Sequence, residues 1–298
     1  MKNRSYNSRR EFLLKSALWS GATLTSSSMP IFSAFANDDL TVGDIMDRFI
    51  QRIPHAPFAQ TVDTLKSGTR DQKVTGVVTT MFATVKVIQK SIELGANFII
   101  AHEPTFYNHL DETDWLEEDD VFKFKRDLLE QNQIALWRNH DYIHSMKVDG
   151  IQIGVVNQLG WNDYYKQNAV LNIPKTTLKG LIDHMKDRLD VPAMRYVGDL
   201  NQPIEKVLLL PGAIGGRRQI EMAMKENPDV IIVGEAPEWE TPEYVRNANE
   251  MGKEISYIAT GHSASEEGGG AFMADWIRKN YPELPVHHLP SKNSLEIY

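Results

Sequence analysis

Cysteine is absent from the 298 residues of this chain. Disulfide bonds are therefore excluded, and any metal site has to use histidine, aspartate and glutamate side chains. The Gly-x-Ser-x-Gly motif of many serine hydrolases is also missing, so only an unmarked serine could serve as a nucleophile. After residue 36 no stretch approaches the ~20 apolar residues that a membrane-spanning helix needs.

Residues 1–36 look like a twin-arginine export signal. Arg9 and Arg10 precede a moderately apolar run, and the Ala-Phe-Ala of residues 34–36 is a small-residue cleavage site. We therefore expect residues 1–36 to be removed and the mature protein to be exported, in the periplasm. The alternative is an N-terminal amphipathic helix of the mature fold, which the Ser-Ser-Ser-Met-Pro run at 26–30 would interrupt.

Removal of this segment leaves a chain with a strong acidic excess. The counts fall from 32 basic and 40 acidic residues to 27 and 39, which is a net charge of −12. A surface of this charge repels a phosphate backbone, so nucleic acid is not expected as a partner. We expect a soluble mature protein without membrane attachment that acts on a small molecule.

Helical and strand patterns alternate from residue 40 onward. Apolar residues recur at helical spacing in 40–53 and 84–94, and runs rich in Val, Ile or Thr at 74–81 and 97–101 are typical of strands. This order forms a β-α-β unit, which requires a parallel pair. Further strands are predicted at 134–137, 195–197, 206–210, 230–233, 255–259 and 286–289, and further helices at about 120–132, 150–159, 177–189, 217–227, 242–251 and 265–280.

The fold class that this alternation predicts is α/β. Two subdomains with mostly parallel sheets are expected at about 37–161 and about 177–298, within one unit that covers 37–298. The segment 286–289 is predicted to be an edge strand. Open α/β sheets bind ligands at the carboxyl ends of their strands, so the residues that follow each strand are the candidates for a site.

Several predicted strands end in side chains that can bind metal or carry protons. His102 and Glu103 follow one strand directly, and Pro104 then turns the chain away from the sheet. The next strand runs into polar residues 138–144, and Glu235 lies at the end of a strand in the second half. Histidine and carboxylate groups gathered at one edge are typical of a metal site.

His262 and Glu266 lie where a strand turns into the last helix. Residues four apart share one helix face, so both side chains can point at one ion. The glycine-rich segment 211–216 could cradle phosphate, but it lacks the Lys-Ser/Thr of a P-loop. A plain strand-to-helix turn is therefore the favoured interpretation of this segment.

Taken in order, several segments resemble the NIF-three-like dinuclear-metal proteins, the NGG-one-interacting-factor family. The resemblance covers nearly all of the chain after residue 36. The segments that carry it are Asp-Thr-Leu-Lys-Ser-Gly at 63–68, Ala-Thr-Val-Lys-Val-Ile at 83–88, Ala-Asn-Phe-Ile-Ile-Ala-His-Glu-Pro at 96–104, Val-Gly-Glu at 233–235 and Gly-His-x-x-x-Glu at 261–266.

The resemblance implies two metal ions in the cleft between the two subdomains. The ligands that it implies are His102, Glu103, His144, His262 and Glu266. Glu103 stands where the family has a second histidine and His144 where it has an aspartate, so the set keeps three histidines and two carboxylates. Asp141 is an alternative to His144, with His140 then supporting it from behind. A polar cleft without metal also stays open.

The resemblance further implies a hydrolase, with GTP cyclohydrolase activity sometimes assigned to the family. Two divalent ions can activate water and stabilise charge on a substrate oxygen, and a mixed histidine and carboxylate set suits zinc, iron or manganese. Glu235 is the candidate for a catalytic proton carrier or a support for a ligand. A homo-oligomer, as a hexameric ring, is implied as well. The alternative function is a metal-binding scaffold of the cell envelope without catalysis.

Overall fold

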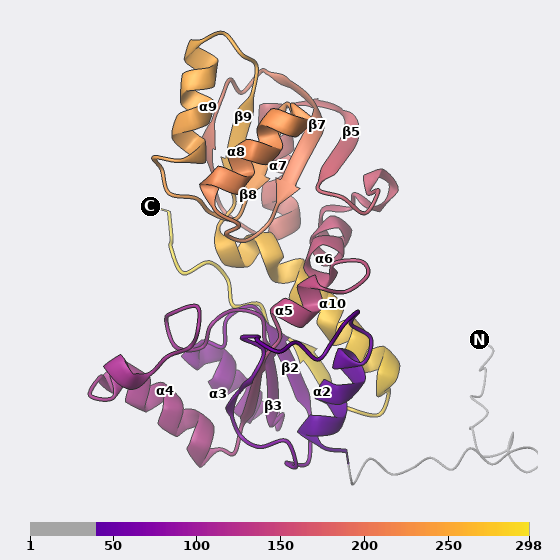
Figure 1. The fold of residues 1–298 in the computed structure, drawn as a ribbon, viewed down its shortest axis with the longest axis vertical. Coiled ribbons are helices and arrows are strands. Elements are labelled where there is room, and N and C mark those ends of the chain that lie inside the picture. The colour runs from indigo at the N-terminus through magenta and orange to yellow at the C-terminus, as the bar shows by residue number, and fades with distance from the viewer. Residues whose placement is uncertain (1–39, 298) are drawn as a thin grey trace, which may run out of the picture. The chain divides into compact units, whose positions relative to one another are not determined.

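Residues 40–297 are described by a computed structural model of the chain, shown as a ribbon in Figure 1. Contacts divide the chain into residues 1–36 and residues 37–298, and every described residue belongs to the second unit. The predicted signal peptide, residues 1–36, lies outside the described residues. The described part contains two five-stranded sheets with helices between their strands, which confirms the predicted α/β class.

The first sheet joins strands from both ends of the described chain. β2, β3, β4 and β10 are parallel to one another, and β1 at one edge is antiparallel to β4. The edge position predicted for residues 286–289 is confirmed by β10. Across the sheet the strands are β1 (Leu65–Ser67), β4 (Ala135–Arg138), β3 (Phe98–Ala101), β2 (Val77–Thr80) and β10 (Val286–His288).

Helices cover both faces of the first sheet, namely α2 (Val42–Ile50) and α10 (His262–Asn280) on one face and α3 (Val85–Glu93) and α4 (Asp120–Gln131) on the other. Successive strand residues alternate between the two cores. Phe98 packs in the core with α2 and α10, and Ile99 packs in the core with α3 and α4. Because both faces are buried, the central strand β3, Phe-Ile-Ile-Ala, appears in the sequence as an unbroken apolar run.

The second sheet has the same layered organisation. β7, β8 and β9 are parallel, and the edge strands β5 and β6 are antiparallel to their neighbours. The strands in order are β5 (Val170–Thr177), β7 (Pro203–Leu210), β8 (Val230–Val233), β9 (Ser256–Ala259) and β6 (Arg195–Val197). Helices α6 (Gly150–Leu159) and α7 (Leu178–Leu189) pack on one face, and α8 (Gly216–Glu226) and α9 (Thr241–Glu250) on the other.

Capping side chains fix where several of these helices begin. The Thr41 hydroxyl accepts from the backbone N–H of Asp44 at 3.2 Å, and the Asp44 carboxylate accepts from the backbone N–H of Thr41 at 2.9 Å, which is a capping box. Asp149 caps α6 by accepting from the N–H of Ile151 at 2.8 Å. None of the helices in residues 40–297 combines the length and hydrophobicity that a bilayer crossing requires.

Some elements differ from those predicted. β1 lies in a segment predicted to be a loop, and β5 lies in the predicted link between the two halves. α10 begins at His262 rather than near Ser265, and β7 begins at Pro203 rather than Lys206. A four-residue helix, α5 (Asp141–His144), and the 3-10 turns η2 (Asp114–Leu116) and η3 (Asn162–Tyr164) are also additions. Segments of three or four residues are too short for a periodic pattern to mark.

The end of the chain departs from the predicted division into residues 37–161 and 177–298. β10 pairs with β2, with Val286 opposite Val77, and therefore belongs to the first sheet. Met273 and Ile277 of α10 lie in the core of that sheet as well. The physical reason is that Val286 buries its side chain in the same core as Met273 and Ile277, so the C-terminal strand packs with the first sheet.

Helices α6 and α10 lie side by side and touch through glycines (Figure 1). A Cβ atom on Gly154 would lie 2.3 Å from the carbonyl oxygen of Gly268. A Cβ atom on Gly268 would in turn lie 2.4 Å from the carbonyl oxygen of Gly154. The two backbones are thus in direct contact, and neither position has room for a side chain.

We expect Gly154→Ala to lower the free energy of unfolding by about 2 kcal/mol or more, because the added methyl group forces two packed backbones apart. Alanine is the better helix former by about 1 kcal/mol, so propensity alone predicts the opposite sign. Urea unfolding followed by circular dichroism measures the change. Asn157→Ala, at an exposed position of the same helix, is the matched control and should cost nothing. Equal stability of the two variants would contradict the direct contact.

Candidate metal centre

Four histidine rings gather near the carboxyl ends of the strands, each with its Nδ1 atom against an oxygen. His102, directly after β3, places Nδ1 3.1 Å from the carbonyl oxygen of Asn139. His140, at the start of α5, places Nδ1 2.9 Å from Oδ1 of Asp141. The two rings stack, with centroids 4.8 Å apart.

The other two rings follow the same rule. His144 places Nδ1 2.9 Å from Oδ2 of Asp149, the residue that also caps α6. His262, in the first turn of α10, places Nδ1 3.2 Å from Oε1 of Glu235. A histidine whose Nδ1 shares its proton with an oxygen keeps Nε2 for a second partner, which is the usual arrangement of metal-binding histidines.

Two buried carboxylates meet these Nε2 atoms. Oε1 of Glu103 lies 3.1 Å from Nε2 of His262 and 3.7 Å from Nε2 of His102. Oε2 of Glu266 lies 3.2 Å from Nε2 of His262 and 3.7 Å from Nε2 of His102. His262 and Glu266 thus share one face of α10, as their spacing predicts.

Two groups of side chains could each hold a metal ion, and both include His102. One group joins His102 with His140 and His144, the other joins it with Glu103 and Glu266, and within each group the ligand atoms lie within 4.8 Å of one another. Nε2 of His102 is buried and has no hydrogen-bond partner in the described residues. A buried polar atom without a partner is costly, and a metal ion would supply the partner, so these residues fit a metal.

Charges in the cluster are set by burial and by close pairing. Burial, with the charge of neighbouring His144, holds the pKa of His102 well below its usual value, so its imidazole is neutral, the form that binds metal. Burial also acts to lower the pKa of His262, but hydrogen bonds to Glu103, Glu235 and Glu266 outweigh it and raise that pKa to about 12. The carboxylates thus already hold a positive charge between them.

Asp63 holds the short helix that carries two of the histidines. Its carboxylate accepts from the backbone N–H groups of His140, Asp141 and Tyr142 at 2.8, 2.9 and 2.7 Å. These are donors at a helix N-terminus that would otherwise lack partners. The segment before β1 therefore fixes the direction of His140 and His144.

Asp141 is already engaged elsewhere. Its Oδ2 atom accepts from the Thr61 hydroxyl at 2.8 Å and from the N–H of Val62 at 3.1 Å, while Oδ1 faces His140. Of the two alternatives considered from the sequence, the structure brings His144 rather than Asp141 next to His102.

His140 is the member of the cluster that the sequence analysis does not name as a candidate ligand. It was expected to support Asp141, and the structure shows the reverse, with Asp141 behind His140. The signal was available in the spacing of His140 and His144, which is the same four-residue interval as that of His262 and Glu266.

A buried arginine at the end of β4 braces the other side of the cluster. Arg138 is fully buried, and its Nε donates to the carbonyl oxygen of His102 at 3.3 Å. Its guanidinium lies 3.9 Å from Glu103 and 3.4 Å from Asp111. Asp111 also pairs with Lys66 at 3.1 Å, so the loop after Glu103 is tied back to the sheet.

The glycine-rich segment 211–216 is a strand-to-helix turn, as favoured from the sequence. The N–H of Gly212 donates to the Ser265 hydroxyl at 2.9 Å, and the N–H of Gly216 donates to Glu240 at 2.8 Å. These two donors are therefore not free to cradle a phosphate. The turn instead packs against α10, where a Cβ atom on Gly212 would meet the carboxylate of Glu266.

Residues 40–294 match the model of the Duf34/NIF3 (NGG1p interacting factor 3) family. The chain belongs to this family. The resemblance inferred from the motifs at 63–68, 96–104 and 261–266 is confirmed as far as the family and the fold are concerned. The function of the cluster is therefore considered for a member of the Duf34/NIF3 family.

Known relatives support the same assignment. The chain is 29% identical over 249 residues to a Clostridium acetobutylicum protein named GTP cyclohydrolase 1 type 2 homolog, a match over 78% of this chain and 88% of the relative. The Staphylococcus aureus hypothetical protein SA1388 has a crystal structure that aligns with a TM-score of 0.69 at 17% identity, over 88% of this chain and 100% of that one. A Bacillus cereus protein related to NIF3 gives 0.67 at 16% identity, over 88% and 99%. At such identities the two structures show a shared fold.

A buried lysine of α4 holds the loop that follows the cluster. Nζ of Lys125 donates to the carbonyl oxygen of Thr105 at 2.7 Å, and the residue is only 6% exposed. Burial lowers the pKa of Lys125 to about 8, against a smaller opposing effect of Asp111. Between about pH 8 and pH 10.5 the unfolded chain therefore binds more protons than the folded one, and stability rises with pH.

We expect the free energy of unfolding of the wild type, relative to that of Lys125→Met, to rise by about 3 kcal/mol between about pH 7.5 and pH 10.5. The methionine variant cannot titrate and so lacks this pH dependence. Urea titrations of both proteins across the range measure the difference. Lys253→Met, which replaces an exposed lysine, should show no such rise. If the difference in free energy of unfolding between the wild type and Lys125→Met does not change with pH, a buried ammonium at position 125 is ruled out.

Proposed function

We propose that this Duf34/NIF3 protein is a metal-dependent hydrolase that uses two divalent transition-metal ions on a small polar substrate. The side chains that would hold the ions are His102, Glu103, His140, His144, His262 and Glu266. The observation that carries the proposal is the common orientation of the four histidines, each with Nδ1 against an oxygen, together with the buried Nε2 atom of His102, which has no partner in the described residues.

The types of ligand atom in the cluster limit which metal ions it suits. Imidazoles and carboxylates, without any cysteine, suit zinc, iron or manganese. The two ligand groups share His102, whose one available nitrogen can bind only one ion, so the count of two ions rests on the family resemblance. When bound, such ions polarise a substrate oxygen and make water a stronger nucleophile.

The chain itself supplies orientation and a dry interior. His102, Glu103 and Glu266 are 3%, 6% and 3% exposed, whereas the side chains of His140, His144 and His262 are 24%, 32% and 20% exposed, so the cluster has a dry interior and a more open rim. Each histidine is held by an oxygen acceptor, which fixes the orientation of the ring. Its side chain therefore loses little conformational entropy when a metal ion binds.

Glu235 acts in this proposal as a positioning residue for His262. The hydrogen bond with His262 lowers the pKa of Glu235 below its usual value, so this carboxylate stays ionised and is a weak base. Its side chain is 54% exposed, whereas its Oε1 atom is held 3.2 Å from Nδ1 of His262. These features favour orientation of the ring over the proton transfer that the sequence also suggested.

We expect the purified protein to carry divalent transition metal, and His102→Ala to lose at least about tenfold in metal affinity because His102 belongs to both ligand groups. Elemental analysis after dialysis against buffer measures the content. His184→Ala is the matched control, since that ring stacks on Trp161 and lies outside both groups. Near-zero transition metal in the wild type would reject the proposal.

GTP is the first substrate to test, because the Clostridium acetobutylicum relative bears the name GTP cyclohydrolase 1 type 2 homolog. We expect His262→Ala to lower turnover by about 100-fold or more and Glu235→Gln by about tenfold, since the second change affects only the orientation of His262. Release of product from GTP and from a panel of small hydrolase substrates is followed by chromatography. Metal binding with equal turnover in wild type and His262→Ala would favour a non-catalytic scaffold.

We also propose that residues 1–36 direct export by the twin-arginine route and that the mature protein is a periplasmic homo-oligomer, a hexameric ring. The arginine pair and the Ala-Phe-Ala site support the first part, and the family resemblance supports the second. Mass spectrometry of the exported protein should find an N-terminus at Asn37, and light scattering should give a hexameric mass. An exported chain that still begins at Met1, or a monomeric mass, would reject the respective part.

A further inference from the structure

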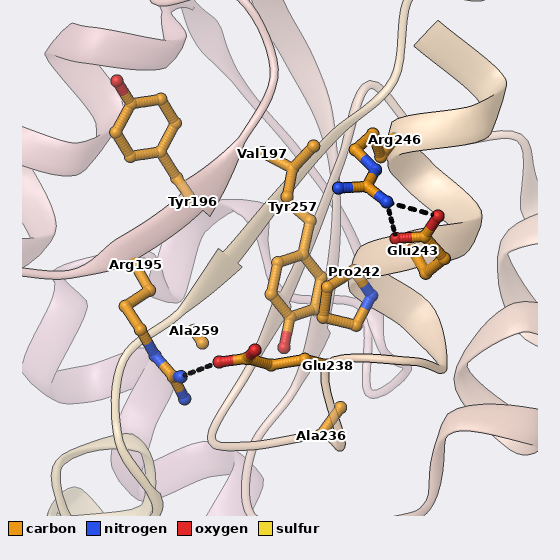
Figure 2. A pocket seen from close by; sticks show the side chains of 10 residues that line it. All are labelled: Arg195, Tyr196, Val197, Ala236, Glu238, Pro242, Glu243, Arg246, Tyr257 and Ala259. Atoms are coloured by element: carbon orange, nitrogen blue, oxygen red, sulfur yellow. Dashed lines mark hydrogen bonds and ion pairs between the residues drawn. The ribbon is translucent and has the colours of Figure 1, made fainter. Parts of the chain in front are cut away.

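A pocket of about 280 Å³ opens at the ends of β8 and β9, where Ala236 and Ala259 line it (Figure 2). Ala236 follows Glu235 directly, and Ala259 ends β9 shortly before His262. The volume is close to the lower end of small-molecule sites, about 300 Å³, so it suits part of a small ligand. Its lining residues are Arg195, Tyr196, Val197, Ala236, Glu238, Pro242, Glu243, Arg246, Tyr257 and Ala259.

Tyr257 is the side chain that marks the pocket as a binding site. It is 3% exposed, and its hydroxyl has no hydrogen-bond partner among residues 40–297. The hydroxyl end of the ring points into the space bounded by Arg195, Glu238 and Pro242 (Figure 2). The hydroxyl is not among the fully buried polar atoms, so a ligand in the pocket can reach it, and it is a donor that a ligand oxygen can accept from.

The pocket also offers positive charge that a ligand can reach. Arg195 pairs with Glu238 at 3.0 Å, but the two side chains are 60% and 82% exposed, so this ion pair is weak and easily exchanged. Arg246 pairs with Glu243 on the opposite wall. Each carboxylate in the lining thus already has its arginine, while the tyrosine donor has no acceptor.

Helix α9 begins at the pocket and adds to this preference. It runs for ten residues from Thr241, its first turn includes Pro242 and Glu243 of the lining, and no side chain caps its N-terminus. The N-terminus of a helix carries partial positive charge and favours an anion. The walls formed by Val197, Pro242 and Ala259 are apolar and suit the carbon skeleton that bears the anion.

We propose that this pocket binds the carboxylate or phosphate group of a small molecule, with the Tyr257 hydroxyl and Arg195 as its donors. The anion takes the place of the Glu238 carboxylate on Arg195. Because Glu235 separates the pocket from His262, the bound group anchors the substrate next to the metal centre. This last point rests on the proposed hydrolase function, whereas anion binding itself does not.

Benzoate and phenyl phosphate test the two sources of anion, with benzyl alcohol as the neutral probe, in isothermal titrations of the purified full chain. We expect both anions to bind at least about tenfold more tightly than benzyl alcohol. Tyr257→Phe should weaken anion binding about fivefold by removing one donor. Glu238→Gln should strengthen it about threefold by removing the competing carboxylate. Lys253→Gln, an exposed change outside the pocket, should leave it unchanged.

The opposite signs expected for Tyr257→Phe and Glu238→Gln separate the pocket from a general loss of folding. Since either anion could also bind a metal ion, the titrations are repeated after treatment with a chelator, and the binding that depends on Tyr257 should persist. Anion binding that the chelator abolishes and that Tyr257→Phe leaves unchanged would overturn the pocket while leaving the hydrolase proposal intact. Near-zero metal in the purified protein, together with anion binding that depends on Tyr257, would overturn the hydrolase proposal and leave the pocket intact.

Discussion

The direct backbone contact between α6 and α10 is the constraint on which the candidate site depends. α10 carries His262 and Glu266 in its first turns and places Ile277 in the core of the first sheet, about 22 Å further along at 1.5 Å per residue. The contact of Gly154 with Gly268, two residues after Glu266, fixes the position of α10 along and around its axis relative to α6. A slide or rotation of α10 would move Glu266 away from His102, so the site is specified by backbone packing beside it as well as by its own polar contacts.

Charge balance explains why so many titratable groups tolerate burial here. A buried carboxylate costs free energy unless a positive group lies close to it, and Glu103 has both His262 at 3.1 Å and Arg138 at 3.9 Å. Glu266 has only His262 within that range as a charged partner, because the low pKa of His102 keeps its ring neutral. The cluster is therefore built so that one more cation would stabilise it.

The sequence predicts the elements of this fold better than their assembly. Strand-like runs and helical spacing predict β2, β3, α2 and α3, because both faces of the sheet are buried and each of these two helices buries one side in a single core. The pairing of β10 with β2 joins residues more than two hundred positions apart, which no local pattern encodes. In the site, adjacent or i,i+4 pairs were visible, whereas the placement of His140 depends on three hydrogen bonds to Asp63. The position of Tyr257 in a pocket has no signal in the sequence.

The two substitutions against the pattern implied by the family resemblance are linked in space. A carboxylate at position 103 lies between two cationic side chains, His262 and Arg138. A histidine at this position would supply no negative charge to pair with them. A histidine at position 144 removes a carboxylate from the cluster. The carboxylate of Asp149, with Oδ2 2.9 Å from Nδ1 of His144, supplies a negative charge on the outer side of that ring. Burial acts to lower the pKa of His144, yet the hydrogen bond to Asp149 raises it overall, so the pair behaves as a unit. Because the charge of the cluster is kept while the ligand types change places, the exchange alters which atom faces a metal and preserves the demand for a cation.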